Sequence, residues 1–134
     1  MSQENVEIVR KTIEARNRSL DEWQSFFHPA AEGGDRAVAA GMPTEAHGVG
    51  ELRRDAELWM EIFDDFQAEI VELVELDDQW VLAEVRFRGR GGESGASVTQ
   101  SQVDLYRVGK GLITEQRAGF GSRDEAIEAV GLRG

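Results

Sequence analysis

Residues 96–120 read ASVTQSQVDLYRVGKGLITEQRAGF, two strand-like runs joined by the tight connection Gly109-Lys110-Gly111. β-Branched and aromatic residues around a short glycine-containing turn are typical of a β-hairpin. Asp104 stands out in this pattern, because aspartate is depleted in strands. If its side chain points to solvent it says little, whereas an Asp104 side chain in a pocket is the first candidate for a functional group.

Earlier stretches extend the hairpin into a sheet. Residues 66–76 (FQAEIVELVEL) and 79–90 (QWVLAEVRFRGR) are also strand-like, with Asp77-Asp78 as a turn between them. The segment GRGGESG (89–95) connects the second of these strands to the hairpin. Four strands joined by short turns predict an antiparallel meander.

Helices are expected before and after the strands, over residues 2–18, 20–27, 49–63 and 123–130. Ser19 and Ser122 are each followed three residues later by glutamate, which is the capping-box spacing that opens a helix. His28-Pro29 is expected to end the second helix, because the residue before a proline disfavours helical dihedrals. In the third helix an apolar stripe is expected to face the core, namely Leu52, Ala56, Trp59, Met60 and Phe63.

Helices followed by a strand meander indicate an α+β fold, and 134 residues suit one domain over residues 1–134. Residues 30–46 are the least informative, with a short strand expected near 31–38 and weakened or bulged by Gly33-Gly34. A curved sheet wrapped around helices leaves an apolar cavity at its wider end. Such a cavity is the default place to expect a ligand.

Composition excludes several classes of function. The chain has no cysteine, which rules out disulfides and thiolate chemistry. Its net charge of −11 repels phosphate backbones, so nucleic acid is not an expected partner. The first residues are polar rather than signal-like, and no apolar run approaches the roughly 20 residues of a membrane helix. We expect a cytoplasmic protein with no membrane partner.

The order of these features resembles the SnoaL-like branch of the nuclear-transport-factor-2-like superfamily. The resemblance covers nearly the whole chain and is carried by SQENVEIVRKTIEARNRSLDEW, FFHP, HGVGELRRDAELW, VRFRGRG, GKGLI and SRDEAIEAVGL. It implies a cone-shaped curved antiparallel sheet wrapped around the N-terminal helices. It also implies a cofactor-free protein that forms a homodimer through the outer face of the sheet. The superfamily includes polyketide cyclases, ketosteroid isomerases, limonene epoxide hydrolase and dehydratases.

The resemblance assigns chemistry to this chain only in part. Asp104 falls at or beside the position of the protonated aspartic acid of the isomerases, whereas their first-helix tyrosine corresponds to a position near Thr12. Where they place a first-strand aspartate as base, this chain has Gly33-Gly34-Asp35. The Arg-x-Asp strand motif of the epoxide hydrolases is missing from the strand sequences, which disfavours that reaction.

The direction of the Asp104 side chain separates two interpretations. On alternation alone, Val103 and Leu105 pack inward, and the row Gln100, Gln102, Asp104 and Tyr106 is solvated. The resemblance favours the opposite, with Asp104 in the cone. A buried aspartate without a cation is expected to have a raised pKa, because desolvation disfavours its charged form.

Other candidates follow from the strand faces and from the resemblance. Val81, Ala83, Val85 and Phe87 are expected inside, and Leu82, Glu84, Arg86 and Arg88 outside. On the last strand, Thr114, Gln116, Ala118 and Phe120 are expected inside, unless a bulge near Gly119 breaks the register. Ile113, Glu115 and Arg117 are then expected outside. The candidate ligand-binding residues are Gln100, Gln102, Tyr106, Thr12, Arg16, Asn17, His47, Trp59, Phe63, Val85, Phe87, Gln116 and Phe120.

Two hypotheses remain open at this point. The chain is a pocket protein that binds a small apolar ligand in the cone. Alternatively, it is a cofactor-free cyclase, isomerase or dehydratase acting on a small carbonyl or polycyclic substrate, with Asp104 as acid or base. With two histidines and no cysteine, no metal site is expected.

Overall fold

The computed structural model describes residues 2–35, 45–92 and 95–131. The helices are α1 (Ser2–Arg16), α2 (Leu20–Gln24), α3 (Val49–Ile62) and α4 (Arg123–Ala129). The strands are β1 (Phe27–Asp35), β2 (Ala46–His47), β3 (Phe63–Glu75), β4 (Trp80–Gly91), β5 (Ser97–Gly109) and β6 (Leu112–Phe120). The predicted α+β order of helices and meander is confirmed. Part of the strand expected over 31–38 lies outside the described residues.

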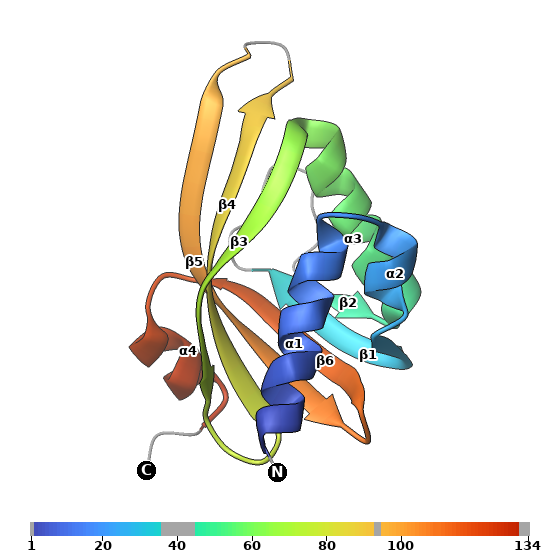
Figure 1. Cartoon of the computed structure of the whole chain (residues 1–134), viewed down its shortest axis with the longest axis vertical. Helices are drawn as coiled ribbons and strands as arrows, with labels where there is room; N and C mark the ends of the chain where they lie inside the picture. Colours follow the sequence, from blue (N-terminus) through green and yellow to red (C-terminus); the bar gives the residue numbers. More distant parts are fainter. Residues whose placement is uncertain (1, 36–44, 93–94, 132–134) are drawn as a thin grey trace.

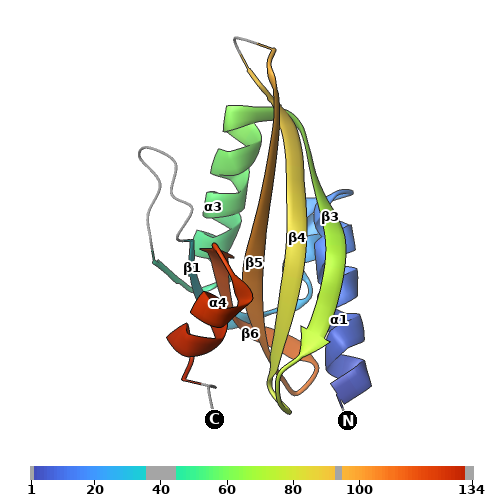
Figure 2. The ribbon, with the colours of Figure 1, turned by 90° about the vertical axis from the view of Figure 1, so that its left-hand side faces the viewer.

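The six strands form one strongly curved, unclosed sheet in the order β2-β1-β6-β5-β4-β3 (Figure 1). β3, β4, β5 and β6 pair antiparallel, as the meander predicts, whereas β1 pairs parallel with β6. Helices α1, α2 and α3 lie on one side of the long strands and α4 lies on the other. Figure 2 shows how far β3, β4 and β5 extend alongside α3.

Capping explains where the short helices begin. The Ser19 hydroxyl accepts the Glu22 N–H at the start of α2, and the Ser122 hydroxyl accepts the Glu125 N–H at the start of α4. The second helix is shorter than predicted. It ends at Gln24, whereas the sequence predicted that it would run to Phe27. Sheet pairing takes over there: the Phe26 carbonyl accepts the Ile113 N–H at 2.8 Å, and β1 begins at the next residue.

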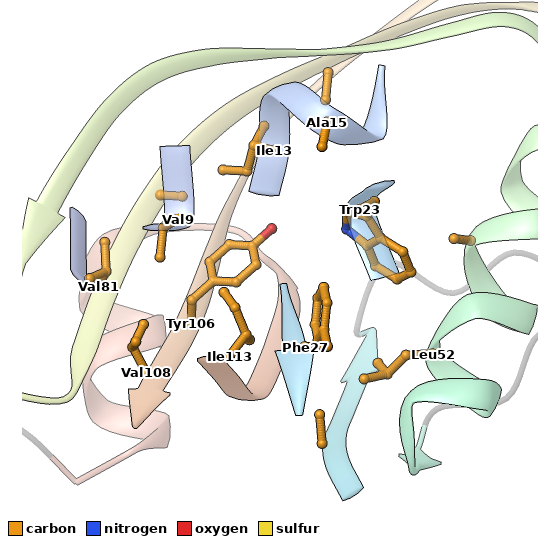
Figure 3. Packing of buried hydrophobic residues seen from close by; sticks show 14 of the residues in the cluster. Val9, Ile13, Ala15, Trp23, Phe27, Leu52, Val81, Tyr106, Val108 and Ile113 are labelled. Atoms are coloured by element: carbon orange, nitrogen blue, oxygen red, sulfur yellow. The ribbon is translucent and has the colours of Figure 1, made fainter. Parts of the chain in front are cut away.

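The core is divided by the sheet into two clusters. The larger lies between the sheet and helices α1 to α3, and Figure 3 shows Tyr106 packed beside Val9, Ile13 and Ile113 within it. The smaller lies under α4 and contains Leu82, which the strand pattern placed on the outer, solvated or dimer-forming face. Leu82 lies on that outer face as predicted, but it is buried within the chain because the C-terminal helix covers it.

One apolar residue of α3 also differs from expectation. Met60 is 46% exposed, although the helical stripe placed it in the core. Leu52 and Ala56 are buried as predicted. Among the described helices, none is long and apolar enough to cross a membrane.

Candidate active site in the cone

Asp104 is buried, with 1% of its surface exposed. Its cross-strand partner is Ala83, which is fully buried in the larger cluster. Val103 and Leu105 are buried as well, but in the smaller cluster under α4. Both faces of this part of β5 are therefore covered. The interpretation from alternation alone, a solvated polar row, is wrong for Gln102, Asp104 and Tyr106, whereas the placement of Asp104 implied by the resemblance agrees with its position in the cavity lining.

A β-bulge in β6 explains how the aspartate is accommodated. Val103 pairs with Phe120 and Leu105 with Arg117, so two residues of β6 lie opposite Asp104. Gly119 has φ +84°, a backbone conformation that side chains disfavour. A bulge leaves a backbone N–H without its ladder partner. The Gly119 N–H donates instead to Asp104 Oδ1 at 3.0 Å.

The bulge moves Phe120 to the other face of the sheet. Its side chain packs in the smaller cluster under α4, 3% exposed. The prediction that Phe120 faces the cone is therefore corrected, for the reason anticipated at Gly119. A second register shift, with Val108 opposite Ile113 and Arg107 opposite Glu115, turns Ile113 into the core. Thr114 then donates to the Arg107 carbonyl rather than facing the cone.

A cavity lies between α3 and strands β3 to β6. Its volume is about 80 Å³, or about 790 Å³ when all the space up to its open mouth is counted. The lining residues are Arg16, Trp23, Gly34, Leu52, Asp55, Ala56, Trp59, Phe63, Phe66, Phe87, Arg88, Gly89, Val98, Gln100, Gln102, Asp104, Gln116 and Ala118.

One wall of the cavity is a run of aromatic rings. Trp59 stacks on Phe63 with ring centroids 5.7 Å apart, and Phe66 stacks on Phe87 at 5.1 Å. Trp59 and Phe66 are also stacked, at 6.1 Å, so the four rings are continuous. Stacking at these distances is favourable, and all four rings belong to the cavity lining.

Phe66 reaches this wall because β3 bulges before it. Asp64 pairs with Arg90 and Gln67 with Arg88, so Asp65 and Phe66 share the place opposite one residue. Asp65 has φ +53°, which a non-glycine residue rarely adopts, and it forms an ion pair with Arg90. The Arg16 guanidinium lies 5.0 Å from the Phe66 ring centroid, so a cation covers this ring.

The part of the lining next to Phe87 is polar and made mainly of carboxamides. Gln100 Nε2 donates to Gln102 Oε1 at 2.8 Å, and Gln102 Nε2 donates to Asp104 Oδ1 at 2.8 Å. On β6, Gln116 Nε2 donates to the Tyr106 hydroxyl at 3.3 Å. The cavity therefore offers aromatic rings for apolar contact with a ligand and, next to them, carboxamides for hydrogen bonds.

Eight of the candidates predicted from the sequence line this cavity, namely Asp104, Gln100, Gln102, Arg16, Trp59, Phe63, Phe87 and Gln116. Tyr106 and Val85 do not line it and are buried in the larger core cluster. Phe120 does not line it either, because its side chain lies on the opposite face of the sheet, under α4. His47 is on β2, where its side chain is 69% exposed and its ring Nδ1 lies 3.3 Å from Glu32 Oε2.

Two candidates, Thr12 in α1 and Asn17 just after it, form hydrogen bonds with backbone groups and do not line the cavity. Thr12 is fully buried, and its hydroxyl donates to the Ile8 carbonyl at 2.7 Å, one turn earlier. Asn17 Nδ2 donates to the Ala68 carbonyl, and the Ala68 N–H donates to Asn17 Oδ1, both at 2.8 Å. Asn17 therefore fastens the end of α1 to β3 and places Arg16 beside Phe66.

Several lining residues were not among the candidates. Leu52 and Ala56 were assigned to the core and also line the cavity, and Trp23 of α2 lines it as well. Asp55 follows from helical spacing, since it lies one turn from Leu52 and from Trp59. Phe66 had no usable signal, because strand alternation does not show a bulge. Among the described residues, no group of three or more histidine, aspartate or glutamate side chains is placed to hold a metal ion.

Comparisons with known proteins agree with this architecture. The family model described as a SnoaL-like domain matches residues 9–116. No curated protein matches the chain.

Three solved structures illustrate the likeness. A putative SnoaL-like polyketide cyclase from Jannaschia sp. CCS1 is 16% identical, with 87% of this chain and 85% of that chain covered and a TM-score of 0.75. A hypothetical protein with a ketosteroid isomerase-like fold from Catenulispora acidiphila, in complex with trimethylamine, is 16% identical over 95% and 94% of the chains, with a TM-score of 0.74. TerC co-crystallised with polyporic acid is 16% identical over 87% and 91%, with a TM-score of 0.76.

At this identity the solved structures show a shared fold, and the family model is the more specific finding. It spans α1 from Val9, the whole of β3 to β5 and β6 as far as Gln116, so it includes most of the cavity. The chain belongs to the SnoaL-like domain family and has the nuclear-transport-factor-2-like, ketosteroid isomerase-like fold.

Proposed function

We propose that this protein binds a small, planar, mainly apolar aromatic molecule in the cavity of the cone. The observation that carries the proposal is the continuous stack of Trp59, Phe63, Phe66 and Phe87, which lines the cavity beside the carboxamides of β5 and β6. Two structural neighbours were solved with small molecules, which supports ligand binding by this fold but not a particular class of ligand.

The chemistry of the aromatic and carboxamide parts of the lining selects this class of ligand. A ring laid against the stack gains apolar burial and about 0.5–1.5 kcal/mol of aromatic pairing per contact. The carboxamides then satisfy one or two polar atoms of the ligand without a charge being desolvated. A strongly charged ligand is disfavoured, because the lining carries both arginine and aspartate side chains.

The test is a titration with 2-naphthol, followed by ligand-observed NMR and by thermal unfolding. A ligand at 100 times its Kd stabilises the fold by about 2.7 kcal/mol, which raises the Tm of a chain of this size by about 8 °C. Phe66→Ala removes one ring of the wall and is expected to weaken binding about tenfold. The matched control is Val71→Ala on the same strand, because Val71 is 47% exposed and does not line the cavity.

The proposal fails if 2-naphthol and a wider panel of bicyclic aromatics neither bind nor raise the Tm. It also fails if Phe66→Ala and Val71→Ala bind the probe equally, because binding would then occur elsewhere.

A cofactor-free cyclase, isomerase or dehydratase remains the second candidate, favoured by a buried carboxylate on the cavity wall. Against it, the Thr12 hydroxyl is bonded to its own helix, and Gly34 on the first strand offers no side chain. Exchange of the α-protons of 2-tetralone in D₂O tests the idea. Acceleration by the protein that Asp104→Asn abolishes would establish acid–base catalysis, and no acceleration would remove this candidate for enolisable ketones.

The homodimer and the cytoplasmic location implied at the sequence level stay predictions. A single domain over residues 1–134 is proposed on the same basis. Light scattering at micromolar concentration checks the oligomer, and a monomeric mass would refute the dimer.

A further inference from the structure

The hydrogen bonds along β5 run in one direction. Gln100 donates to Gln102, Gln102 donates to Asp104, and the Gly119 N–H donates to the same oxygen, Oδ1 of Asp104. A backbone N–H can only donate, so Oδ1 is held as an acceptor whatever the charge of the carboxyl group. The aspartate therefore fixes which end of the Gln102 carboxamide faces it.

The orientation of the Gln102 carboxamide in turn fixes the orientation of the Gln100 carboxamide. Because Gln102 gives its N–H to Asp104, its Oε1 faces Gln100 and requires a donor there. Gln100 donates from Nε2, so its own Oε1 is the acceptor at the end of this row of hydrogen bonds. Gln100 borders the cavity, and its cross-strand partner is Phe87, the last ring of the aromatic wall.

We infer that Asp104 is a positioning residue, which acts through Gln102 to present the carbonyl oxygen of Gln100 to the ligand. The inference rests on the proposed aromatic-ligand function and names its specificity. A ligand ring lying against Phe87 should carry a hydroxyl or N–H donor at its edge, aimed at Gln100. An ether or a carbonyl at that place cannot donate to Gln100 Oε1, so this particular hydrogen bond is lost.

Two probes of nearly the same shape test this specificity. 2-Naphthol donates a hydrogen bond, whereas 2-methoxynaphthalene does not. The wild-type protein is expected to bind 2-naphthol about three- to tenfold more tightly, the ratio that one neutral hydrogen bond supports. Ligand-observed NMR titrations give both Kd values.

Three variants separate positioning from simple contact. Gln102→Met cuts the chain but leaves Gln100, Asp104 and the Gly119 bond in place, and it is expected to reduce the preference to less than twofold. Asp104→Asn retains an oxygen for the Gly119 and Gln102 donors and is expected to keep the preference. Thr99→Val, on the exposed outer face of β5, is the control and is expected to behave as wild type.

The outcomes distinguish the two proposals. If both probes bind wild type equally, or if Gln102→Met keeps the full preference, the positioning role is wrong although the cavity still binds aromatics. If Asp104→Asn loses the preference while remaining folded, charge rather than orientation is responsible, which also overturns the inference. If neither these two probes nor the wider panel of bicyclic aromatics binds, the aromatic-ligand function fails and this specificity fails with it.

Discussion

Replacing Gly33 by alanine tests the close approach of β1 to β6. Gly33 pairs with Gln116 in the parallel part of the sheet and with Ala46 on its other side. A Cβ atom at Gly33 would lie 2.5 Å from the Gln116 carbonyl oxygen and 2.7 Å from Leu52 Cδ2. The first is a backbone atom fixed by sheet pairing, so Gly33→Ala must separate the strands or displace α3.

The size of the effect follows from these contacts. Inserting one methyl group into a close-packed site costs about 1–3 kcal/mol, and the upper half of that range is expected where backbone must move. Urea denaturation measures the loss. With a slope of about 1.5 kcal/mol/M, a loss of about 2–3 kcal/mol lowers the midpoint by about 1.3–2 M.

Gly50→Ala provides the matched control. It makes the same chemical change within α3, where a Cβ would meet nothing within 4 Å. Alanine in a helix is favoured over glycine by about 0.5–1 kcal/mol, so this variant should be more stable than wild type. If Gly33→Ala unfolds within about 0.5 kcal/mol of wild type, the strand spacing deduced for β1 and β6 is incorrect.

Three further outcomes are expected from elsewhere in the fold. Asn17→Ala removes both hydrogen bonds to Ala68 and should cost about 1–3 kcal/mol, with faster amide exchange at Ala68; unchanged exchange would contradict this. The hydrogen bond from Arg18 lowers the pKa of Glu22 below its ordinary value of 4.5, so this group stabilises the fold above that pH and loses the effect in acid. Glu22→Gln should therefore lower the Tm at neutral pH but not below the lowered pKa, and a deficit that persisted in acid would refute the assignment. Ser122→Ala should cost about 1 kcal/mol in urea denaturation, whereas an unchanged midpoint would show that the cap is dispensable.

Much of the fold was predictable because its signals are local. The capping serines Ser19 and Ser122 mark helix starts through bonds to residues three positions away, and short turns mark the meander. The parallel pairing of β1 with β6 was not derivable from the residues, since it joins segments about 80 residues apart along the chain.

The face of Asp104 was misjudged by alternation for a physical reason. Alternation assumes one wet face and one dry face, but α4 covers the outer side of this part of β5. Aspartate is tolerated there because the bulge at Gly119 provides a donor that only tertiary structure reveals. For the same reason the contribution of Phe66 to the site was missed, since it depends on the bulge at Asp65.

The bond pair between Asn17 and Ala68 has a consequence for self-association. β3 is the last strand of the sheet, and an outermost strand with unpaired backbone groups is a template on which other chains can add. The Asn17 carboxamide occupies both the N–H and the carbonyl of Ala68, as a neighbouring strand would. One side chain at the end of α1 thus blocks the middle of that outermost strand, which guards the sheet against edge-to-edge aggregation.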